Sequence, residues 1–599
     1  MLKELLVACA LIAPVATASA QSVSFVDVTQ SAGVWGSYFL PGKEIPGGGA
    51  VVDVNNDGFQ DIFVLGGYSS DRLFMNDGDG TFTESALAWG VSWSHRGVGV
   101  AVGDYNNDGW MDLYVTSFGP AASLGQHRLY RNEGGTHFTD QAVLAGVNAT
   151  SALVPDGYGA AFGDYDLDGD LDLFVGGWES FDGNRLFQNQ GNGTFVDVTA
   201  TALGPIASYT FSPRFVDMND DFYPELLLAA DFATSRYFRN DGFGGFVDDT
   251  NATGTGLDHN GMGHTVADYN GDGLLDWYVT SIFANGLLWP TVPGTGNMLY
   301  MQQPDQTFLE TATPANVDDG GWGWGTVSID FDHDGFVDIV ETNGFDDDVQ
   351  FENEQSYAFR NNGLGVFTDV SVATGIANHN LQGRGLASFD YDNDGDQDLV
   401  FFANNDLTKL YRCDLTGPDQ HWLRVFLNTA GTSLAPNGVG SRVRVRALGV
   451  QQVRSVDGGC NYLSQSELSA HFGLGAATMA QEVRVEWSNG IVTALDNVAV
   501  DQTLTIAPGA FTFRRGDVNG DNAVNLADAI AALVAVFGGG TPVPCLRACD
   551  TNADSLVDVS DPIFLLNGLF NAGASDLIGE CVYGDTPGTL PCSIGSACP

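Results

Sequence analysis

Positive charge is scarce in this chain. Only 23 of its 599 residues are Lys or Arg, and three of these are Lys, whereas 75 are Asp or Glu, which gives a formal net charge of −52. Nucleic acids and anionic membranes are bound through basic patches, so both are poor candidates as partners. A hydrophobic fraction of 44% is ample for packed cores, so the acidity does not indicate disorder. The length predicts several domains.

Long apolar runs are also missing. After residue 20, no run approaches the roughly 20 residues needed to cross a bilayer. Residues Met1–Ala20 have the pattern of a secretory signal, with Lys3 as the positive residue, Leu5–Ala13 as the apolar core and Ala18–Ala20 as a small-residue cleavage site. We therefore expect a secreted or cell-surface protein with no transmembrane segment.

Cysteine is infrequent. Export favours disulfides, but an odd number of cysteines follows the signal, so one of them is free or intermolecular. Their pairing cannot be deduced from sequence. The seven cysteines are Cys413, Cys460, Cys545, Cys549, Cys581, Cys592 and Cys598.

What the chain does have is a repeated acidic loop. In the copy that begins at Asp164, oxygen side chains occupy positions 1, 3, 5 and 9, and Gly169 occupies position 6. A hard cation such as Ca²⁺ takes six to eight oxygen ligands. Side chains on alternate positions of a tight loop can converge on one point, and the glycine allows the sharp turn. The apolar run Leu171–Val175 then predicts a buried strand.

Seven copies of this loop share one register, with their first residues 51 to 62 positions apart. An acidic solvated loop would not repeat its glycine and its following strand, so the pattern predicts calcium loops. In the fourth copy Phe222 replaces the glycine, and a bulky residue with positive φ is unfavourable, so we expect the weakest site there. The candidate ligands are Asp53, Asn55, Asp57, Asp61; Asp104, Asn106, Asp108, Asp112; Asp164, Asp166, Asp168, Asp172; Asp217, Asn219, Asp221, Glu225; Asp268, Asn270, Asp272, Asp276; Asp330, Asp332, Asp334, Asp338; and Asp390, Asp392, Asp394, Asp398.

Each repeat predicts four antiparallel strands. A small-residue strand such as Gly97–Gly103 enters the loop, an apolar strand leaves it, and a third strand with an Asn/Gly turn precedes a short strand such as Phe195–Asp197. Seven such units predict a mostly β fold with a seven-bladed β-propeller. The seventh repeat lacks its fourth strand, and Phe25–Thr29 carries the missing signature. We therefore expect residues 24–29 to complete the last blade.

The loops and the Gly-rich strands before them resemble the FG-GAP/VCBS repeats of integrin-α-type propellers. The resemblance covers about residues 24–412 and implies a Ca²⁺ between strands 1 and 2 of each blade.

The region after Cys413 changes pattern. Alternating runs such as Arg442–Arg446 predict a half-buried sheet and hence a small β domain. This region resembles an ASPIC/UnbV domain, and the combination with the propeller resembles the cartilage acidic protein type of extracellular protein, which implies no catalytic residues. The segments that carry the resemblance are Asn437–Val443, Gly459–Ser466, His471–Gly475 and Trp487–Gly490.

Near the C-terminus two EF-hand-like loops lie 33 residues apart, and each runs into a helical pattern, over Leu526–Val536 and Pro562–Phe570. This arrangement resembles a dockerin and implies a small α-helical calcium module with a cohesin-like or cell-surface anchor as partner. The Ser/Thr pair that dockerins commonly carry at positions 10 and 11 is replaced by Leu526-Ala527 and Val559-Ser560. The candidate ligands are Asp517, Asn519, Asp521, Asn525, Asp528, Asp550, Asn552, Asp554, Asp558 and Asp561.

These patterns divide the chain into five parts. We expect a signal peptide at 1–20, the propeller at 21–413, the ASPIC/UnbV domain at 414–510, the dockerin-like loops at 514–575 and a Cys-containing tail at 576–599.

Strand order places the loops between strands 2 and 3, and between strands 4 and 1, around one mouth of the ring. Aromatic and charged residues gather on this face, and they either bind a glycan or protein or pack between blades. They are Lys43, Glu44, His95, Arg96, Tyr158, Arg214, His259, His264, Trp322, Trp324, His379 and Arg384.

No G-x-S-x-G, H-E-x-x-H, P-loop or Rossmann fingerprint is present. The leading hypothesis is a secreted, calcium-binding adhesion or ligand-binding protein that is not an enzyme. The alternative is a lyase or hydrolase acting on acidic polysaccharide in the propeller mouth. A third hypothesis is a passive matrix component. The catalytic candidates of the alternative are His95, Arg96, His259, His264 and Arg384.

Overall fold

The computed structural model describes most of the chain up to residue 509 and parts of the C-terminal region. The described residues are 22–39, 45–118, 126–149, 156–179, 183–289, 292–345, 351–352, 354–377, 381–509, 512–514, 516, 518, 524–537, 549, 551–552, 557, 559–570 and 581–583. The expected signal peptide therefore lies outside the described residues, as do Lys43, Glu44 and His379.

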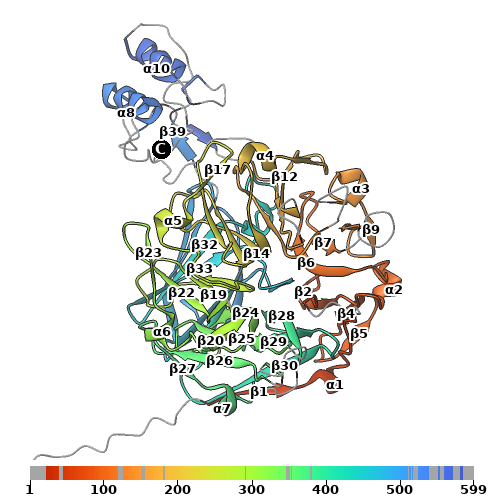
Figure 1. Cartoon of the computed structure of the whole chain (residues 1–599). Coiled ribbons are helices and arrows are strands. Elements are labelled where there is room, and N and C mark those ends of the chain that lie inside the picture. The colour runs from red at the N-terminus through yellow and green to blue at the C-terminus, as the bar shows by residue number, and fades with distance from the viewer. Residues whose placement is uncertain are drawn as a thin grey trace, which may run out of the picture.

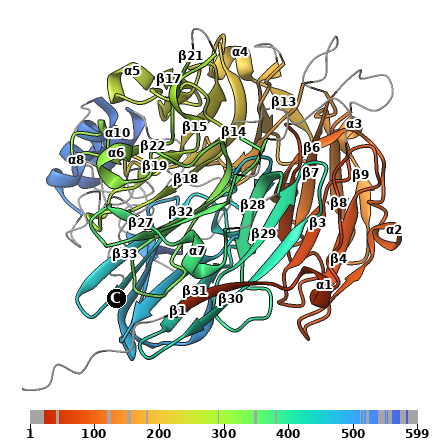
Figure 2. The same cartoon turned by 60° about the horizontal axis from the view of Figure 1, so that its bottom comes forward.

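Seven sheets with four antiparallel strands each follow one another along the chain (Figures 1 and 2). We number them 1 to 7, and together they give a β-propeller-like fold. Sheets 1 to 4 consist of β2 (Gly49–Val52), β3 (Asp61–Val64), β4 (Arg72–Asn76), β5 (Phe82–Glu84); β6 (Gly97–Gly103), β7 (Asp112–Ser117), β8 (Arg128–Asn132), β9 (Phe138–Asp140); β10 (Ala160–Gly163), β11 (Asp172–Val175), β12 (Arg185–Asn189), β13 (Phe195–Asp197); and β14 (Tyr209–Val216), β15 (Glu225–Asp231), β16 (Arg236–Asn240), β17 (Phe246–Asp248).

Sheets 5 to 7 repeat the order, and a hairpin of β20 (Phe283–Trp289) and β21 (Val292–Thr295) is inserted into sheet 5. The strands are β18 (His264–Ala267), β19 (Asp276–Val279), β22 (Met298–Gln302), β23 (Phe308–Glu310); β24 (Gly323–Ile329), β25 (Asp338–Asn343), β26 (Tyr357–Asn361), β27 (Phe367–Asp369); and β28 (Gly383–Phe389), β29 (Asp398–Ala403), β30 (Lys409–Thr416), β1 (Ser22–Asp27). A one-turn helix follows each fourth strand: α1 (Thr29–Ala32), α2 (Ala86–Trp89), α3 (Ala142–Ala145), α4 (Thr199–Ala202), α5 (Thr250–Thr253), α6 (Ala312–Ala315) and α7 (Ser371–Thr374).

The N-terminal strand completes the seventh sheet, as the sequence predicts. Strand β1 pairs antiparallel with β30 along its whole length, from Ser22 opposite Thr416 to Asp27 opposite Tyr411. Phe25 in this strand is 4% exposed and packs edge-on against Phe331 of the neighbouring sheet, with ring centroids 6.0 Å apart. The last sheet is therefore built from strands near both ends of the 389-residue stretch that the FG-GAP resemblance covers.

A ring of side-chain hydrogen bonds joins each sheet to the one before it. In six sheets the last residue of the third strand is Asn or Gln, and its amide donates to the backbone carbonyl of the second loop residue in the preceding sheet. For example, Asn189 Nδ2 donates to Tyr105 O at 2.8 Å. Asn76 of sheet 1 donates in the same way to Tyr391 of sheet 7 at 2.8 Å, which closes the ring. The other four donors are Asn132, Asn240, Gln302 and Asn361.

The middle domain, which begins at β31 (His421–Leu427), consists of two further sheets. One has the order β35-β31-β38 and the other β33-β32-β36-β37, and a shared core includes Phe472 and Trp487, both fully buried. The expected alternation is confirmed, because the valines of β32 are buried between its arginines. The elements are η2 (Pro436–Gly438), β32 (Ser441–Ala447), β33 (Val450–Val456), β35 (Ala470–Gly475), β36 (Met479–Glu486), β37 (Val492–Ala499) and β38 (Gln502–Ile506).

Residues 457–469 of the middle domain enter the ring, and we call them the channel segment. Within it β34 (Ser464–Gln465) pairs in parallel with β2, the first strand of sheet 1. The Gln465 side chain bonds both backbone groups of Val102 in sheet 2, and Ser464 bonds Leu386 in sheet 7. The segment thus contacts first strands on both sides of sheet 1. Small residues on these strands make room for it, since a Cβ at Gly48 would lie 2.2 Å from Leu463 O.

The C-terminal part contains the two expected helices, α8 (Leu526–Phe537) and α10 (Ser560–Phe570), which lie together at the top of Figure 1, apart from the sheets. They share a small core that includes Ala529, Ala532 and Leu565. Strands β39 (Thr512–Arg514) and β40 (Cys581–Tyr583) pair antiparallel and bring the two ends of this part together.

Closure of the seventh sheet can be tested with adjacent residues of β1. Replacing Phe25 by Ala should cost about 3–5 kcal/mol, because it removes a large buried side chain between two sheets. Val26 is 37% exposed, so Val26→Ala should change stability by no more than about 0.5 kcal/mol. Hydrogen exchange should show that only Phe25→Ala loses protection in β28 to β30. Loss confined to sheet 1 would show that β1 does not support the seventh sheet.

Candidate metal loops

The first acidic residue of each loop is the centre around which the loop backbone folds. In the third loop, Asp164 accepts backbone N–H bonds from Asp168 at 3.1 Å and from Gly169 at 3.0 Å. Two residues in the left-handed region make this turn, Leu167 with φ 59° and Gly169 with φ 94°. The glycine at position 6 therefore serves the conformation that the sequence predicts.

The ninth residue of each loop has a second role that the sequence analysis missed. Asp172 is fully buried, and its two oxygens accept backbone N–H groups from Tyr165 in the loop, at 3.2 Å, and from Asn189 at the end of the third strand, at 2.8 Å. The same pair of contacts occurs in the other loops that end in Asp. The ninth carboxylate thus fixes the loop to its own sheet, whether or not it also binds a metal. The equivalent residues are Asp61, Asp112, Asp276, Asp338 and Asp398.

Three loops bring three carboxylates together. In loops 3, 6 and 7 the acidic residues at positions 1, 3 and 9 each offer an oxygen, and these oxygens lie within 4.8 Å of one another. Several buried oxygens in these clusters have no hydrogen-bond partner in the described part of the chain, namely Asp166 Oδ1, Asp330 Oδ1 and Asp392 Oδ1. Crowded, buried oxygens without donors fit a hard cation. The clusters are Asp164, Asp166 and Asp172; Asp330, Asp332 and Asp338; and Asp390, Asp392 and Asp398.

The loops whose third residue is Asn are arranged differently. The amide of Asn55 donates to Asp57 at 2.8 Å, and that of Asn270 donates to Asp272 at 3.0 Å. The amide oxygen of each also accepts a backbone N–H of the same loop. These loops have the same backbone conformation as loops 3, 6 and 7, but each carries one negative charge fewer.

Burial raises the pKa of the loop carboxylates. Desolvation raises the pKa of Asp104 to about 6, although the backbone N–H of Gly109 opposes it. Desolvation also raises the pKa of Asp390 to about 7 despite the nearby guanidinium of Arg424. Neighbouring carboxylates add to the effect, as Asp168 does at Asp164. Without a cation, the ionised form of each cluster is therefore unfavourable.

The fourth loop differs from the others in how its charge is balanced. Phe222 adopts φ 76°, so the chain keeps the loop conformation although a bulky residue occupies the glycine position. The amide of Asn219 donates to both Glu225 and Asp221 at 3.0 Å. Arg442 of the middle domain forms ion pairs with Asp217, at 3.3 Å, and with Asp220. A guanidinium and an amide thus occupy the surroundings of these carboxylates.

The middle domain lies on the loop face of the ring. Arg424 pairs with Asp390 of the seventh loop at 2.7 Å and also donates to Asn393 at 2.8 Å. The backbone N–H of Gly473 donates to Asp330 of the sixth loop at 3.1 Å, and His471 Nε2 contacts Gly395 O at 2.8 Å. Sequence reasoning identified these loops and this domain separately but gave no indication that one covers the other.

The opposite mouth of the ring is filled by packed side chains. Tyr158, Trp322 and Trp324 are at most 7% exposed and belong to one apolar cluster with Tyr462 of the channel segment. Arg214, which the sequence analysis placed on this face, is instead buried near the loop end of β14, where it forms an ion pair with Asp457 of the same segment. Packing, one of the two alternatives from the sequence, therefore applies to these residues.

The five catalytic candidates do not gather in one site. His95 is buried in the connection before β6 and contacts Asp71 at 2.7 Å. His264 is buried in β18 and accepts the indole N–H of Trp277 at 2.9 Å. Arg384 is buried in β28, with its guanidinium 4.2 Å from the Trp324 ring. Only Arg96 and His259 are partly exposed.

The C-terminal ligand candidates are described in part. Asp528 accepts the N–H of Asn525 at 2.7 Å, and Asp561 accepts the N–H of Thr551 at 2.9 Å, so each carboxylate at the helix start caps its own loop. Asn552 donates to Ser560 at 2.8 Å. The other candidates, Asp517, Asn519, Asp521, Asp550, Asp554 and Asp558, lie outside the described residues. Of the expected disulfide cysteines, Cys413 and Cys460 are buried and not disulfide-bonded.

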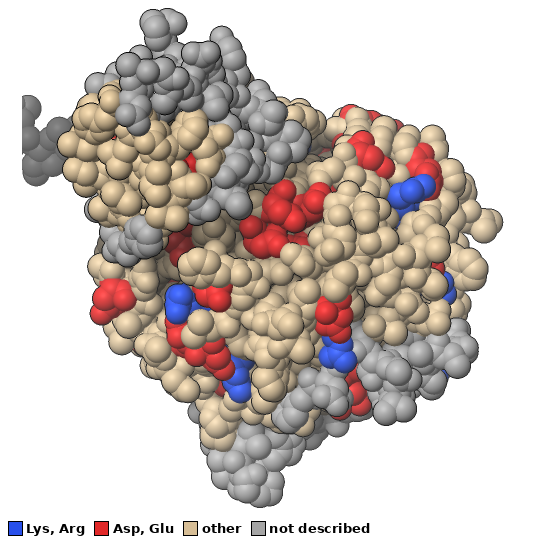
Figure 3. Space-filling view, turned by 90° about the horizontal axis from the view of Figure 1, so that it is seen from above, with Lys and Arg blue, Asp and Glu red and all other residues tan. Residues whose placement is uncertain are grey.

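The distribution of charge on one face and the length of the helices both bear on the partners of the protein. Figure 3 shows a face on which Asp and Glu form clusters while Lys and Arg are scattered. No helix in the described part of the chain is long and apolar enough to cross a membrane.

The raised pKa values predict an unusual pH dependence for the metal-free protein. The pKa values of Asp104 and Asp390 are about 6 and about 7 in the folded protein, against an ordinary pKa of 3.8. Protonation of these two carboxylates therefore stabilises the folded state, and this stabilisation is complete below about pH 4. It is lost as the pH rises through 6 and 7. In EDTA the urea midpoint should therefore be higher at pH 5.5 than at pH 7.5. A midpoint that rises with pH in EDTA would contradict this prediction.

Comparison with known proteins agrees with the repeat pattern. Residues 431–512 match the family described as ASPIC and UnbV, and residues 53–115, 164–228 and 217–279 match the FG-GAP-like repeat. The solved structure of BBS1N in complex with ARL6DN has a TM-score of 0.37 and 10% identity, covering 65% of this chain and 96% of that chain.

Curated relatives include cartilage acidic protein 1 from Xenopus tropicalis, 22% identical over 462 residues, which are 74% of this chain and 61% of that protein. The protein of the same name from Mus musculus is 25% identical over 300 residues, covering 48% and 41%. Integrin alpha-3 from Mus musculus is 34% identical over 143 residues, covering 21% and 13%. The chain thus spans about half the length of the cartilage acidic proteins that it matches. It carries FG-GAP-like repeats and an ASPIC/UnbV domain, and it is similar to cartilage acidic protein 1 and to integrin alpha-3.

Proposed function

We propose that this protein is a secreted, calcium-binding adhesion or ligand-binding protein, and that its seven sheets are the blades of a seven-bladed β-propeller. The observation that carries the proposal is the set of buried loop oxygens without hydrogen-bond donors, among them Asp166 Oδ1 and Asp330 Oδ1. Calcium would supply the positive charge that these clusters need. In each loop except the fourth, the residues at positions 1, 3 and 5 would hold the calcium, and the ninth carboxylate would contact both the calcium and the loop backbone. Similarity to cartilage acidic protein 1 and integrin alpha-3 supports an extracellular, adhesion-type role.

The ligand surface that we propose is the mouth face, through residues that remain exposed around the packed centre. Trp93 is 53% exposed and Tyr68 is 39% exposed, and Arg96 donates to the Tyr68 hydroxyl at 2.7 Å. Across the face, Phe232 is 50% exposed and stacks on Trp178 with centroids 6.3 Å apart. Exposed aromatic faces beside arginine suit the rings of a glycan or the side chains of a protein ligand.

The conformation of Phe232 supports this assignment. It has φ 57°, and the next residue, Ala233, has φ 58°. Left-handed backbone costs a non-glycine residue roughly 1–2 kcal/mol, and Asn-Gly would fill such a turn without that cost. A bulky aromatic kept exposed in a strained turn is consistent with selection for contact rather than for stability.

We further propose that the C-terminal part is a dockerin-like anchor to a cohesin-like or cell-surface partner. Its support is the repeated loop-and-helix pattern, in which α8 and α10 pack on each other, and Asp528 and Asp561, at equivalent positions of the repeat, each accept a backbone N–H of their own loop. The division of the chain at 1–20, 21–413, 414–510, 514–575 and 576–599 belongs to the same proposal.

Calcium stoichiometry tests the metal sites one loop at a time. Asp164→Asn should remove one bound calcium, because it weakens a three-carboxylate cluster. Asp217→Asn should remove none, because Arg442 already pairs with that carboxylate. Equilibrium dialysis with elemental analysis measures both variants against the parent. Chelation should lower the melting temperature, since a site at a hundredfold excess of ligand over Kd contributes about 2.7 kcal/mol. An unchanged calcium count in Asp164→Asn would refute calcium binding by the loops.

Two exposed phenylalanines on opposite faces test the ligand surface. Phe232 lies on the mouth face, and Phe243, which is 95% exposed, lies in the hairpin between β16 and β17 on the loop face. Phe232→Ala should weaken binding to responsive spots on a combined glycan and extracellular-protein array at least several-fold, because aromatic contacts of this kind contribute about 1 kcal/mol or more. Phe243→Ala should bind as the parent does, and EDTA should reduce binding by all three. Equal losses in both variants would place the ligand elsewhere.

A further inference from the structure

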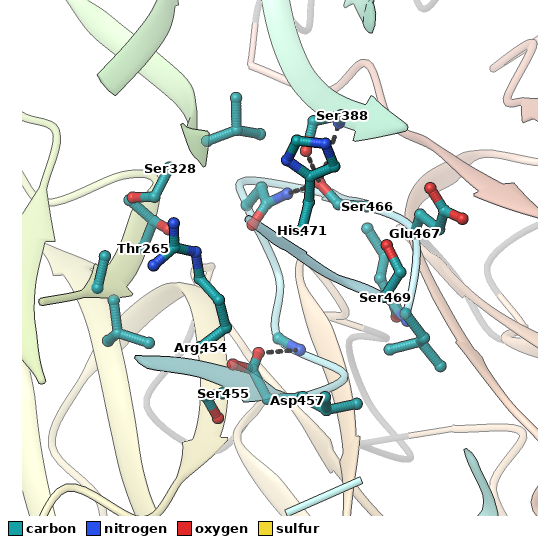
Figure 4. A pocket seen from close by; sticks show the side chains of 18 of the residues that line it. Thr265, Ser328, Ser388, Arg454, Ser455, Asp457, Ser466, Glu467, Ser469 and His471 are labelled. Atoms are coloured by element: carbon teal, nitrogen blue, oxygen red, sulfur yellow. Dashed lines mark hydrogen bonds between the residues drawn. The ribbon is translucent and has the colours of Figure 1, made fainter. Parts of the chain in front are cut away.

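A polar cavity of about 120 Å³ lies in the ring, where the middle domain covers it. The first strands of sheets 5, 6 and 7 supply Thr265, Ser328 and Ser388 to its wall. The middle domain supplies Arg454 from β33 and His471 from β35, together with hydroxyls of the channel segment. Figure 4 shows these side chains surrounding an open centre, with Arg454 beside Thr265 and Ser328. Two structural units that follow one another in the chain therefore share one polar cavity.

Arg454 is the charged residue of the cavity wall that lacks an ion-pair partner in the described part of the chain. Arg214 pairs with Asp457, and Glu467 lies 3.7 Å from the guanidinium of Arg424, which it shares with Asp390. In the described part of the chain, no carboxylate lies within the 4.0 Å of an ion pair from Arg454. Its guanidinium donates hydrogen bonds to two uncharged oxygens, Val453 O at 3.0 Å and Gln452 Oε1 at 3.1 Å. Three of the five N–H donors of this side chain are left for other acceptors.

The carboxylates that interact electrostatically with Arg454 belong to the candidate metal loops. Burial lowers the pKa of Arg454, and Asp330, Asp268 and Asp338 act against that shift. These carboxylates lie in the fifth and sixth loops, where a bound cation would neutralise them. A metal-loaded ring would thus leave Arg454 without a counter-charge, and buried charges in proteins are normally paired.

The remaining groups on the cavity wall suit a polyoxygen ligand. Serine and threonine hydroxyls approach from both the ring and the middle domain, and a hydroxyl can donate to any oxygen acceptor. His471 adds no donor to this wall, because its Nε2–H donates to Gly395 O, so Nδ1, which has no hydrogen-bond partner in the described part of the chain, is an acceptor. The hydroxyl-bearing wall residues are Thr265, Ser328, Ser388, Ser455, Ser466 and Ser469.

We propose that this cavity is a binding site for a small oxyanion, which the Arg454 guanidinium and the surrounding hydroxyls hold between the ring and the middle domain. A tetrahedral anion the size of sulfate fits the volume and can accept hydrogen bonds from several walls at once. The anion joins the ring and the middle domain across an interface in which Arg424 already contacts the seventh loop and Arg442 the fourth. The ligand is structural, and the site is independent of any ligand on the mouth face.

Sulfate is the probe for this site. In the calcium-supplemented full chain, low-millimolar sodium sulfate should raise the melting temperature with saturation, relative to sodium chloride at equal ionic strength. Arg454→Gln should abolish the saturable rise. Arg446→Gln is the matched control, because Arg446 lies on the adjacent strand, has a half-exposed side chain and pairs with Glu482 at 3.6 Å; this variant should respond as the parent does. The proposal is overturned if the parent shows no saturable rise or if Arg454→Gln keeps it.

A second variant covers the case in which Arg454→Gln does not fold. Thr265→Val removes one hydroxyl from the cavity wall beside Arg454, and it should raise the sulfate Kd about fivefold, as expected for the loss of one hydrogen bond. Crystals soaked in selenate should give an anomalous peak beside the Arg454 guanidinium. A cavity that holds only water under these conditions, with an unchanged sulfate Kd in Thr265→Val, would refute the site.

Discussion

A single buried carboxylate at the ninth position of each loop holds the repeat together. Asp172 accepts one N–H from the loop and one from the end of the third strand, so it fixes both to the same point. The residue that provides the second N–H, Asn189, then reaches with its side chain to the loop of the preceding sheet. Loop, sheet and ring are therefore linked by two consecutive contacts.

The repeated carboxylates concentrate negative charge on the loop face of the ring. Seven acidic loops on one face repel each other unless cations lie among them, and the chain has only 23 basic side chains to offer. Arginines of the middle domain contact two of these loops. Arg424 contacts the seventh loop and Arg442 the fourth. The attraction between these arginines and the acidic loops favours the position of this domain on the loop face.

Much of this architecture can be predicted from the sequence because it is repeated. Seven copies of one loop give the strand order, and the unmatched strand at Phe25 identifies the closing pair. The helices near the C-terminus follow from local periodicity. The channel segment could not be predicted in the same way, because it occurs once and its contacts, such as Ser464 with Gly49, join residues more than 400 positions apart. Similarly, Trp322 and Trp324 are on the predicted face, but only the structure shows that they are packed.

The contacts between sheets also have a signal in the sequence, at the ends of the third strands. In six repeats the third strand ends in Asn or Gln, and this regularity indicates the side-chain hydrogen bonds that join neighbouring sheets. Turn formation explains Asn at this position only in part, since Gln302 is a poor turn residue. The seventh repeat has Cys413 there, and its thiol lies 3.8 Å from Phe331 O, where the amides reach 2.7 to 2.9 Å. A thiol is a weak donor, so the junction between sheets 6 and 7 has the weakest of these bonds. That same junction is where Phe25 packs against Phe331. The equivalent aromatic contact, between the Phe of a fourth strand and the second loop residue of the preceding sheet, occurs at four other junctions as well. The junction between sheets 6 and 7 therefore keeps the repeated aromatic contact while its side-chain hydrogen bond is weakened.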